Sequence, residues 1–375
     1  MGKINKNQLS VLISGVGGGS HGEQILKALR LSDLQYEIIG CDIDSTSKGL
    51  AEVDKAYIVP RATDPDFLDV TLDICCKHNI KAVFHGSEIV MMKFAEAREQ
   101  FAVENIYLPI NPDSVLETCQ DKVKTARFLL DNGFKVPEFM EITSAADFLA
   151  FNKYPAVIKP AVQGGGSAHV HIVQSHEELK TFGQYLLKLF GKFIIQEYCG
   201  SPDQEYTVGV LFGSDGTFLN SIAVRRIINN AMSMSFQVEN RTSRKELGKT
   251  LVISSGISQG EIGQFVDITS TCESIAINLK PTAPINIQCR VVNGEVVPFE
   301  INPRFSGTTS LRAMVGFNEP DILIRRDVLC EKIETRFEYE ECVIMRGLQE
   351  VKVSRDHIMK KTGILLGQKL RKKSE

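Results

Sequence analysis

The chain has 375 residues, a formal net charge of −3, and 43% hydrophobic and 24% charged residues. These values are ordinary for a globular protein, and they give no electrostatic reason to expect a nucleic acid partner. No apolar run reaches the roughly 18 residues of a membrane span, and the start, MGKINKNQLS, lacks the apolar segment of a signal peptide. We therefore expect a cytoplasmic protein of several packed units that acts on small molecules, with no membrane partner.

Strands and helices are expected to alternate from Leu9 to about Ile110. The apolar runs LSVLIS, YEIIGC, KAVFHG and IYLPIN are separated by helical patterns. Short buried strands that alternate with helices predict a parallel sheet covered by helices, and ligands of such sheets lie beyond the carboxyl ends of the strands. The loops at those ends are GVGGGSHG, DIDS and HGSE.

The loop GVGGGSHG has two interpretations. Gly17, Gly19 and Gly22 fit the pattern G-x-G-x-x-G, and Asp42 follows twenty residues after Gly22, as in dinucleotide-binding turns. On this interpretation the protein is a nicotinamide-dependent oxidoreductase. The glycines can equally serve a tight turn and the close packing of a helix on a strand.

Two lysines in apolar surroundings predict a phosphate site. Lys122 begins a helical pattern near Cys119, where a new unit starts, and Lys159 ends the strand AVIK. Solvation poorly explains a lysine at the end of an apolar strand, whereas a compact cation over a cleft suits phosphate oxygens. The glycine loop that follows can point bare N–H groups at phosphates, although it is not a Walker loop because no G-K-[ST] follows. Its residues are Gly164, Gly165, Gly166 and Ser167.

The stretch FIIQEYCGSPDQEYTVGVL, residues 193–211, predicts two strands joined by a turn. The main chain from Glu197 to Cys199 can pair with the edge of an adenine, and Glu205 can accept hydrogen bonds from ribose hydroxyls. The alternative is an ordinary hairpin with charged residues at its tip.

A hairpin with one apolar and one polar face is predicted for INIQCRVVNGEVVPFEINPR, residues 285–304. Away from the turn, the odd positions (285–291 and 297–301) are apolar, and the even positions 286, 288, 290, 300 and 302 are polar. A two-residue turn at Asn293–Gly294 would put the apolar sets of the two strands on opposite faces. We therefore predict a three-residue loop that places Val291 opposite Glu295, with Gly294 in the left-handed region.

This register collects oxygen donors on the polar face of the hairpin. Gln288, Glu300 and Asn302 offer one carboxylate and two amides, which suits Mg²⁺ that is also bound to substrate phosphates. Arg304 continues the polar set and offers a planar fork to a transferring phosphoryl group. The alternative is an exposed polar face without a metal.

These motifs together resemble the ATP-grasp superfamily, in particular its carbamoyl-phosphate-synthase-like members. The matching stretches are DK at 121–122, VIKP with GGGS, QEYC, EYTVGV and Q-x(11)-E-I-N-P-R, in the order typical of that superfamily. The resemblance implies an α/β and α+β fold, with a Rossmann-like pre-ATP-grasp domain at residues 1–118. A two-subdomain ATP-grasp fold would follow, with a glycine-rich lid in residues 119–191 and a metal site in residues 192–375.

The resemblance also implies site residues. ATP would be bound by the lysines, the glycine lid, the adenine hinge and a ribose acid: Lys122, Lys159, Gly164, Gly165, Gly166, Ser167, Gln196, Glu197, Tyr198, Cys199 and Glu205. Two Mg²⁺ ions, or Mn²⁺ in their place, would be held by Gln288, Glu300 and Asn302. Glu300 would bridge the ions, and together with Arg304 it would form the catalytic pair. In similar enzymes the first glycine loop faces the acceptor substrate, which implies contacts from Gly18, Ser20, His85 and Glu88.

The activity implied is an ATP- and Mg²⁺-dependent ligase that activates a carboxylate as an acyl phosphate, joins it to an amine, and releases ADP and phosphate. The synthesis of carbamoyl phosphate or carboxyphosphate is the alternative within the superfamily. After Arg304 the chain continues FSGTT and lacks the second arginine of carbamoyl phosphate synthase, which favours a stand-alone carboxylate–amine ligase. Similar enzymes are often dimers, so we also expect a homodimer.

Overall fold

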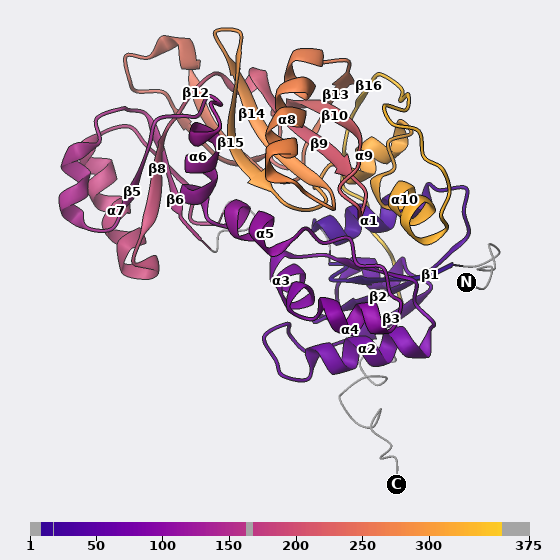
Figure 1. Ribbon diagram of the computed structural model, residues 1–375. Coiled ribbons are helices and arrows are strands. Elements are labelled where there is room, and N and C mark those ends of the chain that lie inside the picture. The colour runs from indigo at the N-terminus through magenta and orange to yellow at the C-terminus, as the bar shows by residue number, and fades with distance from the viewer. Residues whose placement is uncertain (1–8, 18, 163–167, 355–375) are drawn as a thin grey trace. The chain divides into compact units, whose positions relative to one another are not determined.

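The computed structural model describes residues 9–17, 19–162 and 168–354 (Figure 1). The chain divides into two compact units. The first contains the residues up to Ile110, Phe305–Thr335 and those from Gly347 onward, and the second contains Asn111–Arg304 and Arg336–Arg346. Both units mix helices and strands, which confirms the expected α/β and α+β class. The three-domain division made from the sequence stays a prediction.

The first unit is built on a parallel sheet with the strand order β3-β2-β1-β4. Its strands are β1 (Leu9–Ser14), β2 (Tyr36–Asp42), β3 (Lys55–Ile58) and β4 (Ala82–His85). Its helices are α1 (His21–Arg30), α2 (Phe67–Lys77), α3 (Glu88–Glu96), α4 (Arg98–Val103), α9 (Thr309–Met314) and α10 (Glu319–Leu323). The middle strands β1 and β2 are apolar and almost fully buried, as the sequence predicts for a sheet covered by helices.

Glycines bring the loops after β1 and β4 and the start of α1 into close contact. Gly15 has a φ of +94°, and a Cβ atom on Gly22 would lie only 2.0 Å from the Gly15 carbonyl oxygen. A Cβ atom on Gly86 would lie 1.8 Å from the same oxygen. Any side chain at these positions would therefore separate α1 from the sheet, which supports the packing interpretation of the glycine loop.

The second unit contains an antiparallel sheet with the order β5-β8-β6-β7. Its strands are β5 (Phe139–Ile142), β6 (Ala156–Pro160), β7 (His171–Val173) and β8 (Phe193–Glu197). The helices before and beside it are α5 (Asp113–Gln120), α6 (Lys122–Asp131) and α7 (His176–Phe190). α7 packs on this sheet through Leu179 and Leu186 (Figure 1). Strand β8 comes after the boundary expected at residue 191 and pairs with both β5 and β6, so this sheet extends to Glu197.

A six-stranded sheet with the order β15-β14-β9-β10-β13-β16 forms the rest of the second unit. Its strands are β9 (Glu205–Phe212), β10 (Phe218–Ile227), β13 (Gln259–Gly263), β14 (Ile285–Val292), β15 (Glu295–Asn302) and β16 (Cys342–Ile344). Helix α8 (Val266–Leu279) packs on it and closes its apolar core (Figure 1). A separate hairpin pairs β11 (Met234–Glu239) with β12 (Thr250–Ser254).

The register predicted for the β14–β15 hairpin is wrong at its turn. Val292 pairs with Glu295 across a two-residue turn, in which Asn293 and Gly294 have φ values of 53° and 81°. The local preference of Asn–Gly for this turn outweighs the face pattern that favoured a three-residue loop. The register then shifts beyond Pro298, because Gln288 pairs with Glu300 whereas Cys289 pairs with Pro298.

The shift leaves Phe299 as the extra residue of a β-bulge. This additional residue on β15 shifts the strand pairing by one residue between the turn and the far part of the hairpin. Gln288 therefore lies opposite Glu300, and Asn286 lies opposite Asn302. The predicted meeting of Gln288 with Glu300 is confirmed, although by a bulge and not by the loop that was expected to produce it.

Candidate functional site

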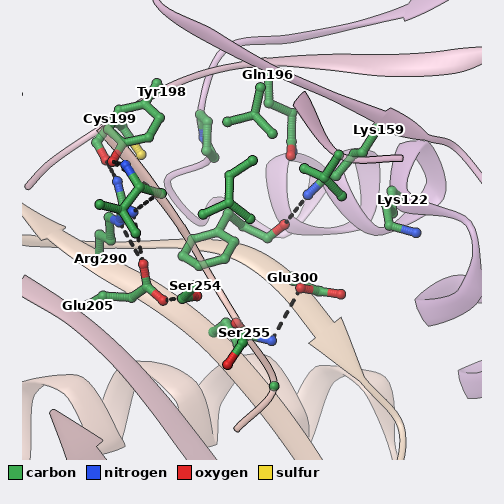
Figure 2. Close-up of a pocket in the computed structure, with 18 of the residues that line it drawn as sticks. Lys122, Lys159, Gln196, Tyr198, Cys199, Glu205, Ser254, Ser255, Arg290 and Glu300 are labelled. Atoms are coloured by element: carbon green, nitrogen blue, oxygen red, sulfur yellow. Dashed lines mark hydrogen bonds and ion pairs between the residues drawn. The ribbon is translucent and has the colours of Figure 1, made fainter. Parts of the chain in front are cut away.

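A cavity of about 170 Å³ in the second unit gathers the predicted residues (Figure 2). Strands β6, β8, β9, β12, β14 and β15 all contribute to its lining. Each residue that the sequence predicted for ATP binding, metal binding or catalysis and that the structure describes lines this cavity: Lys122, Lys159, Gln196, Glu197, Tyr198, Cys199, Glu205, Gln288, Glu300, Asn302 and Arg304. The predicted lid residues Gly164, Gly165, Gly166 and Ser167 lie outside the described part of the chain.

Two lysines form the cationic end of the cavity (Figure 2). Lys159 is buried at the end of β6, and its Nζ donates to the carbonyl oxygen of Phe299 at 3.4 Å. Burial lowers the pKa of Lys159 to about 8, against the opposing effect of Glu300 and with some help from Lys122. Lys122 is held nearby because its own N–H donates to the Ala161 carbonyl just after β6. Two ammonium groups beside the single carboxylate of Glu300 leave this end of the cavity suited to a further anion.

The segment after β8 forms one apolar wall of the cavity. The hydroxyl of Tyr198 accepts from the Val252 N–H at 2.9 Å and donates to the Val252 carbonyl at 3.2 Å, which ties this segment to β12. Val157 and Ile253 add apolar surface to the lining. Burial raises the pKa of Cys199 to about 11, so its thiol stays neutral. A flat aromatic group fits such a wall better than a charged one does.

Glu205 is the centre of a buried ionic network (Figure 2). Its carboxylate lies 2.9 Å from Nη2 of Arg290 and 3.1 Å from Nη1 of Arg226, and the Ser254 hydroxyl donates to it at 2.5 Å. Burial would raise the pKa of Glu205, but the two guanidinium groups and the hydroxyl outweigh burial and hold the pKa below its usual value. The carboxylate is therefore charged and already bonded, and its contact with a ribose stays a prediction.

Arg226 and Arg290 are residues of this network whose role the sequence did not predict. Arg226 lies near the end of β10 inside the apolar run SIAVRRI, and its side chain is 3% exposed. Arg290 belongs to the polar set of β14, and its guanidinium lies 4.5 Å from the centre of the Tyr198 ring. A charged residue within a strand of a covered sheet is the signal that could have marked both as site residues.

Gln288, Glu300 and Asn302 meet at the lysine end of the cavity, where the charge of Glu300 acts on Lys159. The Nε2 of Gln288 donates to Oε2 of Glu300 at 3.2 Å, and its Oε1 accepts from Nη1 of Arg226 at 3.1 Å. Glu300 and Asn302 alternate along β15, so their side chains lie on one face. The Oδ1 of Asn302 accepts from Nη2 of Arg304 at 3.2 Å.

The donor set of this end fits a magnesium ion that arrives with phosphates. No group of three or more His, Cys, Asp or Glu side chains suited to a metal occurs among residues 9–17, 19–162 and 168–354. One carboxylate with amide oxygens is what Mg²⁺ uses when phosphate and water complete its coordination. Glu300 and Asn302 supply such oxygens beside the two lysines.

The acceptor residues predicted in the first unit do not gather at one described cavity. Ser20 lines a cavity of about 320 Å³ with Asp42 and Arg61, whereas neither His85 nor Glu88 is part of its lining. His85 is fully buried, and its Nδ1 lies 3.3 Å from Nε2 of His21. Gly18 lies outside the described residues. The substrate role of this set stays a prediction.

The N-terminus of α1 already holds a carboxylate from its own chain. Glu23 accepts from the Gly19 N–H at 2.7 Å and pairs with Lys27 at 2.9 Å and Lys48 at 3.3 Å. In a dinucleotide-binding turn, the pyrophosphate occupies this end of the helix. The Glu23 carboxylate thus satisfies the Gly19 N–H beside this end of the helix, which supports the structural interpretation of the glycine loop.

Comparisons with known proteins identify families for two stretches of the chain. Residues 119–308 match the family described as ATP-grasp domain, and residues 11–108 match the family described as PylC-like, N-terminal domain. The D-alanine–D-alanine ligase of Aquifex aeolicus is 38% identical over 95 residues, which are 25% of this chain and 32% of that protein. The α-aminoadipate–LysW ligase LysX of Sulfurisphaera tokodaii is 32% identical over 117 residues, or 28% of this chain and 41% of that protein. The matches thus span less than half the length of these curated relatives.

Solved structures share the fold at low sequence identity. The biotin carboxylase domain of 2-oxoglutarate carboxylase from Hydrogenobacter thermophilus, solved with MgADP, ADP and bicarbonate, has a TM-score of 0.59 at 14% identity. The match covers 88% of this chain and 70% of that one. Separately, no helix in the described part of the chain is long and apolar enough to cross a membrane.

Proposed function

The chain belongs to the ATP-grasp family, and from this premise we propose that it is an ATP- and Mg²⁺-dependent ligase that joins a carboxylate to an amine and releases ADP and phosphate. The observation that carries the proposal is the single cavity in which two lysines, an apolar hinge and the Glu300–Asn302–Arg304 set meet. Phosphates, a purine and a metal ion are the three parts of MgATP that these groups suit.

The hinge is proposed to bind the adenine. The N–H groups of Glu197 and Tyr198 already donate to the carbonyls of Glu138 and Pro155, at 2.7 and 2.9 Å. An adenine edge would therefore use other main-chain groups of the hinge, with the Cys199 N–H among them. Val157 and Ile253 would cover the faces of the ring.

The chemical step brings two anions together. A carboxylate oxygen attacks the γ-phosphorus of ATP, the bond to the β-phosphate oxygen breaks, and ADP leaves. Lys122 and Lys159 would neutralise the phosphate oxygens, and Arg304 would hold the transferring group. Magnesium, when bound with the nucleotide through Glu300, Asn302 and Gln288, would withdraw further charge from these oxygens. Gln288, Glu300 and Asn302 would hold two such ions, with Mn²⁺ able to replace Mg²⁺.

The second step forms the amide. The amine attacks the carbonyl carbon of the acyl phosphate, inorganic phosphate leaves with its oxygen, and the amine loses a proton. The names of the two curated relatives describe ligases whose partners include amino acids, which supports an amino acid as one substrate here. Small-molecule substrates, a cytoplasmic location and a homodimer complete the proposal.

The test measures ADP release with pooled amino and hydroxy acids as carboxylates and amines. Release should require both a carboxylate and an amine, and Glu300→Gln should lower it by on the order of 10²-fold because a charge-stabilising group is lost. Glu295→Gln is the matched control, since this exposed carboxylate lies on the same strand and contacts Lys135 at the surface. Absence of ATP binding in the presence of Mg²⁺, or an unimpaired Glu300→Gln enzyme, would contradict the proposal. Release stimulated by bicarbonate alone would favour the synthesis of carbamoyl phosphate or carboxyphosphate.

A further inference from the structure

A buried arginine contacts one of the proposed metal ligands. The guanidinium of Arg226 contacts three groups: the carboxylate of Glu205, the side-chain oxygen of Gln288 and the main-chain carbonyl of Ser255. Its side chain is 3% exposed, so water does not screen this charge as it would at the surface. Arginine keeps its proton in proteins, so the positive charge of Arg226 is permanent and lies next to the residues proposed to bind Mg²⁺.

The contact with Arg226 settles which way the Gln288 amide faces. Arginine carries only hydrogen-bond donors, so the atom of Gln288 that faces it must be the oxygen. The Nε2 group then points at the Glu300 carboxylate, 3.2 Å away, and each end of the amide has a suitable partner. In this arrangement Gln288 presents its N–H₂ group, which cannot bind a metal, to the metal side.

We propose that Arg226 competes with the metal ion for the side-chain oxygen of Gln288 and thereby makes the metal site dependent on the nucleotide. The inference rests on the metal site of the proposed function. While Arg226 holds the oxygen, two of the three proposed ligands, Glu300 and Asn302, still offer oxygens to an ion, and the Asn302 oxygen is itself bonded to Arg304. Such a set is weak for Mg²⁺, which therefore enters with the phosphates that supply its remaining ligands.

Arg226 acts on the metal in two physically distinct ways, and these can be separated. Its charge repels any cation nearby, and its hydrogen bond withdraws one particular ligand. Removal of Arg226 relieves both effects, but only the second depends on the oxygen of Gln288. A double-mutant cycle between positions 226 and 288 therefore isolates the competition from the charge.

The experiment titrates Mn²⁺ alone into the nucleotide-free, full-length protein and measures the free ion by electron paramagnetic resonance. The variants are Arg226→Met, Gln288→Met and the double variant. Arg226→Met leaves Glu205 paired with Arg290, so Glu205 keeps a buried counter-ion. We expect this variant to bind Mn²⁺ on the order of tenfold more tightly than the wild type, the size of effect typical of groups that position metal ligands.

The double variant decides the inference. If the competition operates, the gain from Arg226→Met is smaller when Gln288 is already Met, and the gain that remains in Arg226→Met/Gln288→Met measures the effect of the charge alone. If Arg226→Met shows no gain, or if the double variant keeps the whole gain, the competition is wrong. Gln288→Met provides a second test should Arg226→Met fail to fold. By itself it should leave nucleotide-free Mn²⁺ affinity within about threefold of the wild type, whereas loss of an engaged ligand would lower it tenfold or more.

Titration in the presence of ADP separates this inference from the proposed function. Wild-type protein that binds no Mn²⁺ even with ADP contradicts the metal site itself. If the wild type binds Mn²⁺ with ADP but Arg226→Met does not raise the Mn²⁺ affinity of the nucleotide-free protein, only the role of Arg226 is contradicted. Thermal unfolding of each variant confirms that the compared proteins are folded.

Discussion

The ammonium group of Lys159 on β6 donates a hydrogen bond to the main-chain carbonyl of Phe299 on β15, 3.4 Å away. Phe299 is the extra residue of the bulge in the β14–β15 hairpin, where the ladder of strand pairing is interrupted. The irregularity that sets Gln288 opposite Glu300 thus places an acceptor for the lysine beside the proposed metal ligands.

Nucleotide binding should weaken as the pH rises above about 8. Burial lowers the pKa of Lys159 to about 8, and only the protonated lysine attracts phosphates. The measurement is the dissociation constant of ADP with Mg²⁺ on both sides of this pH. Lys159→Arg keeps its charge and should bind with little dependence on pH over this range. A wild-type profile as flat as that of Lys159→Arg would count against the role of the lysine.

The same lysine should make nucleotide-free protein gain stability in alkali. The unfolded chain keeps the proton of Lys159 up to about pH 10.4, whereas the folded chain releases it near pH 8. Between these values the unfolded state binds more protons, so this contribution rises with pH, and it is lost as the pH falls through 8. The difference in unfolding free energy between wild type and Lys159→Met should follow this course. A difference that does not change with pH would contradict it.

Glu205→Gln should destabilise the protein by about 3–5 kcal/mol, because the buried Arg226 and Arg290 would lose their shared counter-ion. The folded protein holds the pKa of Glu205 low, so the stabilisation is present above the unfolded pKa of about 4.3 and is lost as the pH falls through the folded value. Chemical unfolding of wild type and variant should therefore converge in acid.

Glu261→Gln is the control for Glu205→Gln. Glu261 on β13 pairs with Arg225, the neighbour of Arg226, but at the exposed surface. Its removal should cost at most about 1 kcal/mol. Equal losses of unfolding free energy from the two substitutions would show that burial does not increase the contribution of the Glu205 ion pairs to stability.

Gly294→Ala should destabilise the β14–β15 hairpin by roughly 1–2 kcal/mol, because Gly294 has a φ of +81° that a side chain disfavours. A Cβ atom at this position would meet nothing within 4 Å, so the cost is conformational and not steric. The check is the free energy of unfolding, with Gly347→Ala as the control, since that glycine is also uncrowded but does not have a positive φ. Equal losses of unfolding free energy from Gly294→Ala and Gly347→Ala would contradict the positive φ of Gly294 in this turn.

Glu23→Ala should destabilise the first unit by roughly 1–2 kcal/mol, since it removes the acceptor of the Gly19 N–H at the start of α1. Glu99→Ala, in the first turn of α4, replaces an exposed carboxylate and should have little effect. NADH should not bind the wild type near micromolar concentrations, because the Glu23 carboxylate already accepts from the Gly19 N–H and adds negative charge beside the start of α1. Saturable NADH binding would revive the nicotinamide interpretation.

Much of the site could be read from local patterns. The alternation of strands and helices predicted the parallel sheet of the first unit, and the apolar strand before Lys159 predicted a buried lysine at a cavity. The spacing of Glu300 and Asn302 placed both on one face because strand side chains repeat every two residues. These inferences depend on neighbours in sequence, which the chain displays directly.

Long-range pairing decided the rest. The bulge at Phe299 arises because the two-residue turn requires one register and the apolar face of the hairpin requires another. The sequence indicates both registers, but it does not indicate where along the strands one changes to the other. Arg226 on β10 reaches Gln288 on β14 across one intervening strand, β9. Residue patterns do not encode this strand order. The partners of Glu23 and Glu205 likewise come from residues up to 85 positions away, and a charge looks the same in sequence whether it faces solvent, a ligand or an arginine.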